Sequence, residues 1–202
     1  MKKLILLTAL LFPFLMSSAQ KVEKSIIDDF TGNKVIYTSW EKIKSNNITG
    51  RNQLLARFRY ENNLQYFELK WITGESVGNQ SGRFSVTDDA KLLLKLSNGE
   101  VVTLKSIEYS IAQKGLGTTG LSFSALYGMH LKYIGDDISK LSGKEYVTKV
   151  RIYTTDGYVD IELKEKDSKK INELYAIFIT EIEKPIDASI PREKSSVNED
   201  DF

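Results

Sequence analysis

Three segments of the chain repeat one pattern, and this pattern constrains the fold more than any other feature of the sequence. Each segment has a run of alternating apolar and polar residues, two residues that tolerate a positive φ angle, and a second alternating run. The runs are 54–60 and 64–71 around Asn62-Asn63, 91–96 and 101–109 around Asn98-Gly99, and 146–153 and 158–163 around Asp156-Gly157. Because a period of two is typical of strands and these dipeptides favour tight turns, the sequence predicts three antiparallel β-hairpins.

Weaker signals predict further elements around these hairpins. Alternating residues over 34–39 and 122–133 favour two more strands, and the acidic start and glycine stop of the segment 136–143 favour a short helical turn. The second and third hairpins also align without a gap at an offset of 58 residues, which places Leu94 on Ile152. This alignment fits either a duplicated unit or two unrelated hairpins that obey the same turn rules.

One segment near the C-terminus has helical periodicity instead. It starts at Asp167, a favourable N-cap residue, and Pro185 ends it. Its apolar residues share one helix face: Ile171, Leu174, Tyr175, Phe178 and Ile182. This stripe needs an apolar partner, and the face of a sheet supplies one. The predicted fold class is therefore mainly β (α+β), an antiparallel curled sheet, sandwich or barrel of about 7–9 strands with one amphipathic C-terminal helix.

The N-terminus predicts export. Two lysines precede an apolar run over 4–16, and Ser17-Ser18-Ala19 then supplies the small residues of a cleavage site. The apolar run is shorter than the roughly 20 residues that a membrane-spanning helix needs, so we expect no transmembrane span after cleavage. The pattern resembles the signals of Gram-negative envelope proteins. Since no Cys is present for lipid attachment, the resemblance implies a periplasmic or extracellular location.

These signals divide the chain into three parts. We expect a cleaved signal peptide over 1–19, a single β-rich domain over 20–184 and a disordered acidic tail over 185–202. The 28 Lys and Arg residues balance 27 Asp and Glu residues and are spread along the chain. Because a nucleic-acid-binding protein needs a basic stripe, this distribution argues against a nucleic acid partner.

Four motifs suggest chemistry, and none carries the full pattern that its chemistry requires. The G-x-G-x-x-G over 115–120 is followed by strand-like alternation, whereas a dinucleotide site needs a helix there. The S-x-x-K over 39–42 lacks the S-D-N and K-T-G elements of penicillin-interacting enzymes. His130 is the only histidine and has no G-x-S-x-G nucleophile to serve. The pairs 28–29, 88–89 and 136–137 are adjacent aspartates, not carboxylates placed across a cleft.

We therefore expect no enzyme, no catalytic residues, no cofactor and no metal. The ten Tyr, nine Phe and two Trp suggest binding instead. Candidates for a shared exposed aromatic face are Tyr60, Tyr66, Trp71, Tyr127 and Tyr133. The leading hypothesis is an exported, non-catalytic binding or structural module of the cell envelope, whose partner is an envelope protein or a glycan. The alternatives are a carrier of a small apolar, lipid-like ligand in a sheet–helix cavity, and a hydrolase that uses His130 or dispersed carboxylates.

Overall fold

The computed structural model describes residues 22–45, 53–74, 85–114, 126–186 and 190–191. The predicted signal peptide, the glycine motif 115–120 and most of the predicted tail lie outside these residues. The strands are β1 (Val22–Ile27), β2 (Lys34–Thr38), β3 (Glu41–Ser45), β4 (Gln53–Glu61), β5 (Leu64–Gly74), β6 (Ser85–Val86), β7 (Lys91–Leu96), β8 (Val101–Ser106), β9 (Ser110–Ile111), β10 (Gln113–Lys114), β11 (Leu126–Ile134), β12 (Val147–Thr154) and β13 (Gly157–Glu162). The helices are the 3-10 helix η2 (Asp136–Ser142) and the α-helix α2 (Glu165–Glu183).

Eleven of these strands form one antiparallel sheet. Its order is β1-β2-β4-β5-β11-β8-β7-β12-β13, with β3 paired to β4 and β10 paired to β11, while β6 and β9 pair separately. Because β1 and β13 each have a neighbour on one side only, the sheet is open. The predicted mainly β fold with one C-terminal helix is confirmed, and of its three forms the structure has the curled sheet.

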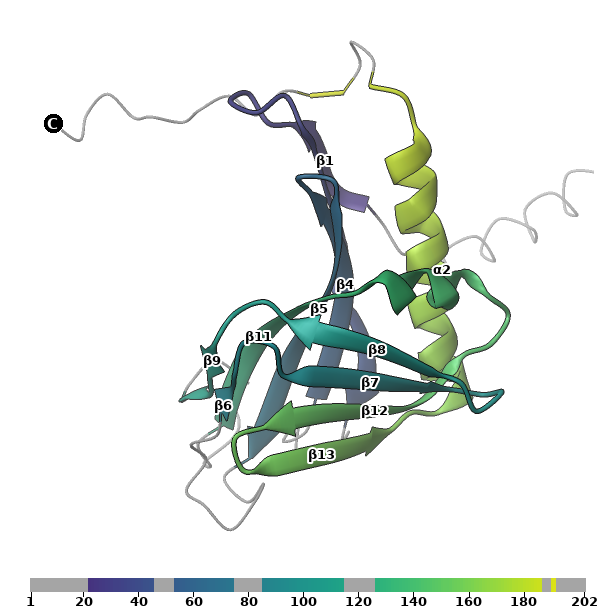
Figure 1. Ribbon diagram of the computed structural model, residues 1–202. Helices are drawn as coiled ribbons and strands as arrows, with labels where there is room; N and C mark the ends of the chain where they lie inside the picture. Colours follow the sequence, from purple (N-terminus) through teal and green to yellow (C-terminus); the bar gives the residue numbers. More distant parts are fainter. Residues whose placement is uncertain (1–21, 46–52, 75–84, 115–125, 187–189, 192–202) are drawn as a thin grey trace, which may run out of the picture.

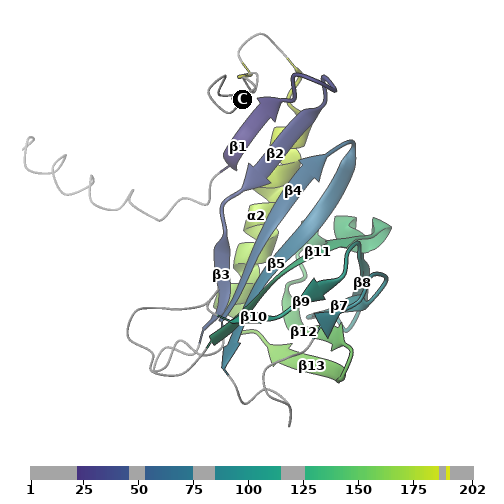
Figure 2. The same ribbon diagram turned by 90° about the vertical axis from the view of Figure 1, so that its left-hand side faces the viewer.

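The sheet bends sharply where β11 meets β8. Only the pairs Tyr133–Ser106 and Ile134–Lys105 join these strands, so the two halves of the sheet can cross at a steep angle. Figure 1 shows β7, β8, β12 and β13 running across the direction of β4 and β5. The helix α2 lies on the concave side, where it contacts β1, β2, β3, β4 and β12. Figure 2 shows it behind β1, β2 and β4.

All three predicted hairpins are present. In the first, Asn62 and Asn63 form the two-residue turn with φ angles of 51° and 61°. In the second, Gly99 has a φ angle of 90° and its amide donates to the carbonyl of Leu96. In the third, Thr154 pairs with Gly157, so the turn begins one residue earlier than the sequence predicts.

The second and third hairpins lie side by side in the sheet. Strand β7 pairs with β12, and Leu93 stands opposite Arg151. These two residues are equivalent at the 58-residue offset found in the sequence. Because the strands are antiparallel, the two hairpins are related by an approximate local twofold axis between Leu93 and Arg151.

Aromatic rings fill the interface between the sheet and the helix. Phe58 and Phe67 pair across β4 and β5, and their ring centroids are 5.2 Å apart. From α2, Tyr175 and Phe178 place their rings 5.0 and 5.4 Å from that of Phe58. All four side chains are at most 2% exposed, so they form a packed core at the sheet–helix interface, where the carrier hypothesis expects a cavity.

Four of the five residues of the predicted apolar stripe of α2 are buried and Ile182 is partly buried, but the start of the helix differs from the prediction. Ile171 and Leu174 are fully buried beside Tyr175 and Phe178. The N-cap residue is Lys164, not Asp167, and no side chain caps the helix. The amide of Asp167 already donates to the carbonyl of Lys164. The helix therefore begins three residues before the position that the capping preference of Asp167 predicts.

Candidate functional site

The five aromatic residues proposed as one exposed face do not share a face. Trp71 and Tyr133 are 4% and 0% exposed on the concave side, and Tyr60 packs half-buried against the same core. Tyr66 lies five residues before Trp71 on β5, and an odd spacing along a strand puts side chains on opposite faces. It contacts the Arg59 guanidinium on the convex side. The side chain of Tyr127 lies outside the described part of the chain.

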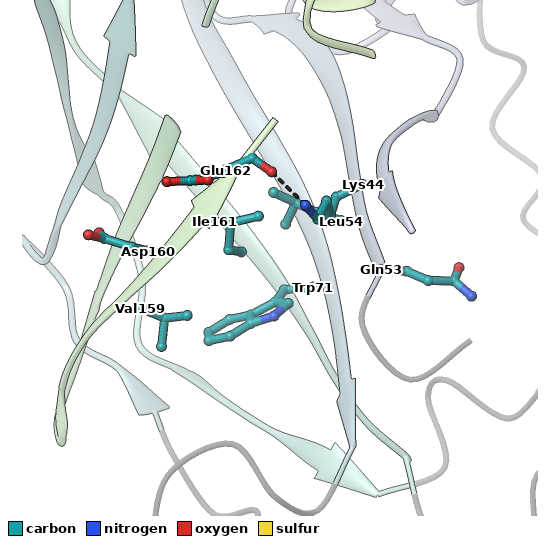
Figure 3. A pocket seen from close by; sticks show the side chains of 8 residues that line it. All are labelled: Lys44, Gln53, Leu54, Trp71, Val159, Asp160, Ile161 and Glu162. Carbon is teal, nitrogen blue, oxygen red and sulfur yellow. Dashed lines mark hydrogen bonds between the residues drawn. The ribbon is translucent and has the colours of Figure 1, made fainter. Parts of the chain in front are cut away.

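A pocket lies where β13 of the third hairpin approaches β3, β4 and β5, and Figure 3 shows it from close by. Its volume is about 230 Å³. The described residues that line it come from β3, β4, β5 and β13: Lys44, Gln53, Leu54, Trp71, Val159, Asp160, Ile161 and Glu162. The two sides of the pocket are therefore about a hundred residues apart in the sequence.

Strand alternation gives the pocket apolar walls. Leu54 and Trp71 face each other across β4 and β5 and form one wall. On β13, Val159 and Ile161 point toward the Trp71 indole, whereas the carboxylate of Asp160 points away from it (Figure 3). Since successive residues of a strand alternate in direction, one edge strand presents an apolar face to the pocket and a charged face to the solvent.

One cation, Lys44, and two carboxylates, Asp160 and Glu162, lie around these walls. They differ in whether a group of opposite charge already pairs with them. The Lys44 ammonium donates to the carbonyl oxygen of Glu162 at 2.7 Å and ties β3 to β13. Arg151 holds Asp160 through two hydrogen bonds of 2.6 and 2.7 Å, which lower the pKa of that carboxyl. Glu162 forms an ion pair with Lys149 at 3.4 Å. Lys44 is thus the one cation among the described lining residues, and both carboxylates already have a cationic partner.

The convex face carries a second polar cluster, built around Glu68. This carboxylate is fully buried, although within the described part of the chain α2 lies on the other face of the sheet. It accepts hydrogen bonds from Arg57 Nε at 2.6 Å and from Arg59 Nη1 at 3.5 Å, and it contacts His130 Nε2 at 3.0 Å. Burial by itself would raise the pKa of Glu68, but the hydrogen bond with His130 and the charge of Arg57 outweigh it and lower the pKa to about 2.

Aromatic rings cover this cluster. The guanidinium of Arg57 lies 4.4 Å from the Trp40 ring centroid and 4.8 Å from that of Tyr37. The ammonium of Lys70 lies 4.2 Å from the Trp40 ring. Such cation–π contacts, together with the ion pairs, keep long charged side chains flat against the sheet. The cluster therefore explains how a carboxylate is buried on the face of the sheet opposite α2.

The remaining candidates from the sequence are dispersed. His130 contacts Glu68 and the edge of the Trp40 ring, and neither partner is an alcohol or a thiol. Asp28 accepts hydrogen bonds from the turn after β1, and Asp137 accepts one from the amide of Thr103. Within the described part of the chain, no three His, Cys, Asp or Glu side chains gather closely enough to hold a metal ion. Among the same residues, no helix is long and apolar enough to cross a membrane.

Of the residues that line the pocket, sequence reasoning named Trp71 as a binding candidate and did not name the others. The alternation over 158–163 already puts Val159 and Ile161 on one face. Nothing local to Lys44 or Gln53 indicates that β3 and β4 end beside β13. A comparison of the chain with protein-family models, with curated protein sequences and with solved structures found no match.

Proposed function

We propose that this protein is an exported, non-catalytic binding module of the cell envelope, and that it holds a small ligand with an apolar part in the pocket between β13 and the ends of β3, β4 and β5. The observation that carries this proposal is the pocket of about 230 Å³ walled by Leu54, Trp71, Val159 and Ile161. The pattern of the first nineteen residues supports export. This proposal joins the binding-module hypothesis to the carrier hypothesis and moves the ligand from the sheet–helix interface to the edge of the sheet.

The volume of the pocket limits the size of the ligand. Each small group in a liquid occupies about 30 Å³, the share of a water molecule. A volume of about 230 Å³ therefore accommodates roughly eight non-hydrogen atoms. Pockets for drug-sized ligands start at about 300 Å³. A short acyl chain or a single ring fits this space, whereas a complete two-chain lipid does not.

Binding of 1-octanol tests the proposal, because its eight-carbon chain matches the volume and it has no charge. The protein is residues 20–202 with Trp40→Phe, which leaves Trp71 in the pocket as the only indole. We expect a saturable change in tryptophan fluorescence and a matching heat in titration calorimetry. A wild-type pocket that shows neither contradicts the proposal.

A filled pocket provides the specificity control. Val159→Phe adds a ring where β13 faces Trp71, and we expect it to weaken octanol binding at least tenfold. Val101→Phe makes the same change at a strand position of β8 that is 42% exposed and does not line the pocket. It should bind octanol like the parent protein. Equal affinity of the two variants would place the ligand somewhere else.

A further inference from the structure

A second cavity lies beside the proposed ligand pocket and has the opposite character. Its volume is about 380 Å³. The described residues that line it are Lys42, Lys44, Ser45, Lys164, Lys166, Asp167 and Lys170. Five of these seven residues are lysines and one is a carboxylate. Lys44 lines both cavities, so the apolar pocket and the lysine cavity meet at its side chain.

The fold concentrates these lysines from two elements. On β3, Lys42 and Lys44 flank the fully buried Ile43, and the pairing of β3 with β4 shifts register between these two lysines. Both residues line the cavity. The start of α2 supplies the remaining lysines, and Lys170 donates from the helix to the carbonyl of Lys42 at 3.1 Å. The sheet and the helix therefore hold the lysine cavity together in the folded chain.

The positive charge of the cavity is largely uncompensated. Asp167 forms an ion pair with Lys170 at 3.4 Å, and the nearby Glu165 pairs with Lys169. No carboxylate of the described residues forms an ion pair with Lys42, Lys164 or Lys166. Like charges brought this close repel one another, and a bound anion relieves that repulsion. The N-terminal end of a helix adds partial positive charge of the same sign.

We propose that the ligand is a monomeric anionic amphiphile, with its short apolar part against Trp71 and its phosphate or carboxylate group at Lys44 and the lysine cavity. This inference rests on the proposed function and adds the charge of the ligand. Three observations favour an anion over a neutral molecule. Lys44 is shared by the two cavities, and Asp160 turns away from the apolar pocket (Figure 3). In addition, Lys42, Lys164 and Lys166 form no ion pair with a carboxylate of the described residues. The Lys44–Glu162 contact is exposed, so a ligand in solution can reach the Lys44 ammonium.

The experiment compares probes with the same tail and different heads. Octyl phosphate and octanoate are titrated beside 1-octanol into residues 20–202 carrying Trp40→Phe. We expect both anions to bind at least tenfold more tightly than octanol at low ionic strength. We expect added salt to reduce this difference, because the lysines are exposed to screening. Equal affinity of the three probes overturns the inference and leaves the proposed function standing, whereas no binding of any probe overturns both.

Lysine variants locate the charge preference. Lys42→Gln combined with Lys166→Gln should reduce the affinity for octyl phosphate toward that of octanol and leave octanol binding unchanged. Lys91→Gln combined with Lys95→Gln removes two exposed lysines from β7 and should change neither affinity. Equal loss of octyl phosphate affinity in both double variants would overturn the assignment to the lysine cavity.

Two further titrations distinguish the sources of an anionic group. Inorganic phosphate that binds as tightly as octyl phosphate would overturn the role of the apolar tail. Vesicles of phosphatidylglycerol that bind the protein when monomeric octyl phosphate does not would overturn the monomeric ligand in favour of a membrane surface. We expect inorganic phosphate to bind at least tenfold more weakly than octyl phosphate. We expect the vesicles to compete only weakly with octyl phosphate for the protein.

Discussion

Two buried tyrosines of the core differ in whether their hydroxyl group has a partner. The Tyr175 hydroxyl donates to Gln65 Oε1 at 3.0 Å, whereas the Tyr133 hydroxyl has no hydrogen-bond partner in the described part of the chain. Burial raises the pKa of both side chains. A buried polar group without a partner destabilises the fold, while a satisfied one contributes a modest net stabilisation.

These two residues should respond to the same substitution with opposite signs. We expect Tyr133→Phe to raise the free energy of unfolding by about 1 kcal/mol and Tyr175→Phe to lower it by about 1 kcal/mol. Urea denaturation of the two variants and the parent protein measures both changes. A destabilised Tyr133→Phe variant would show that the Tyr133 hydroxyl is satisfied after all.

Glu68 makes the stability of the fold sensitive to acid. Its pKa in the folded protein is about 2, below the ordinary value of 4.5. A carboxyl group whose pKa is lowered in the folded protein stabilises the fold at pH values above its ordinary pKa. This stabilisation is lost as the pH falls from about 4.5 toward 2. We expect about 3 kcal/mol of the free energy of unfolding to disappear in that window through this group, as measured by urea denaturation at a series of pH values.

Neutral variants separate this effect from that of the other carboxylates. Glu68→Gln should be less stable than the parent at pH 7, because Arg57 and Arg59 lose their buried partner, and its stability should fall less steeply below pH 4.5. Glu23→Gln, at an exposed position of β1, should follow the parent at every pH. Parallel pH profiles for Glu68→Gln and the parent would contradict the role of Glu68.

At the scale of single elements, the turn residues explain why the sequence predicts the hairpins. Gly99 has a φ angle of 90°, with no atom near the position where a Cβ would stand. Gly143 ends η2 with a φ angle of −73°, which any residue adopts. A substitution at Gly99 therefore strains the backbone without a steric clash, and Gly143 provides a control without that strain.

We expect Gly99→Ala to lower the free energy of unfolding by about 1 kcal/mol. Gly143→Ala should leave it unchanged or raise it by up to about 1 kcal/mol, because alanine reduces the conformational entropy of the unfolded chain. Thermal denaturation followed by circular dichroism compares the two. Equal losses in both variants would mean that the backbone angle of Gly99 is not what its turn requires.

At the scale of the whole molecule, one buried lysine connects the first strands to the last helix. Lys34 on β2 is 6% exposed, and its ammonium donates to the carbonyls of Glu181 and Lys184 at 2.5 and 2.9 Å. The last carbonyls of a helix have no partner within the helix, and they carry partial negative charge. Lys34 therefore donates hydrogen bonds to the carbonyls at the C-terminal end of α2, from a strand that lies about 150 residues earlier in the sequence.

Removing this connection should release the end of the helix. We expect Lys34→Met to lower the free energy of unfolding by about 2 kcal/mol and to speed hydrogen exchange in the last turn of α2 more than in its first turns. Lys91→Met, at an exposed position of β7, should change neither. Uniformly faster exchange along α2 would show that Lys34 stabilises the molecule only globally.

The local sequence determined the main secondary-structure elements of this protein. The period-two runs with Asn-Asn, Asn-Gly and Asp-Gly turns determined the three hairpins, and the spacing from Ile171 to Phe178 determined the buried stripe of the helix. Short strands such as β1 and β3 were not predicted, because their few residues alternate too little to form a pattern. The strand prediction over 122–133 became β11, whose described residues begin at Leu126.

Only the tertiary structure decided which face of each strand is covered and which distant strands are neighbours. Periodicity groups Trp71 with Leu69 and separates it from Tyr66, but it cannot tell which group meets the helix. The pairing of β5 with β11 and the approach of β13 to β3 are long-range contacts that no local signal specifies. The candidate site depends on these contacts, because its apolar walls and its lysines come from elements that meet only when the sheet curls around α2.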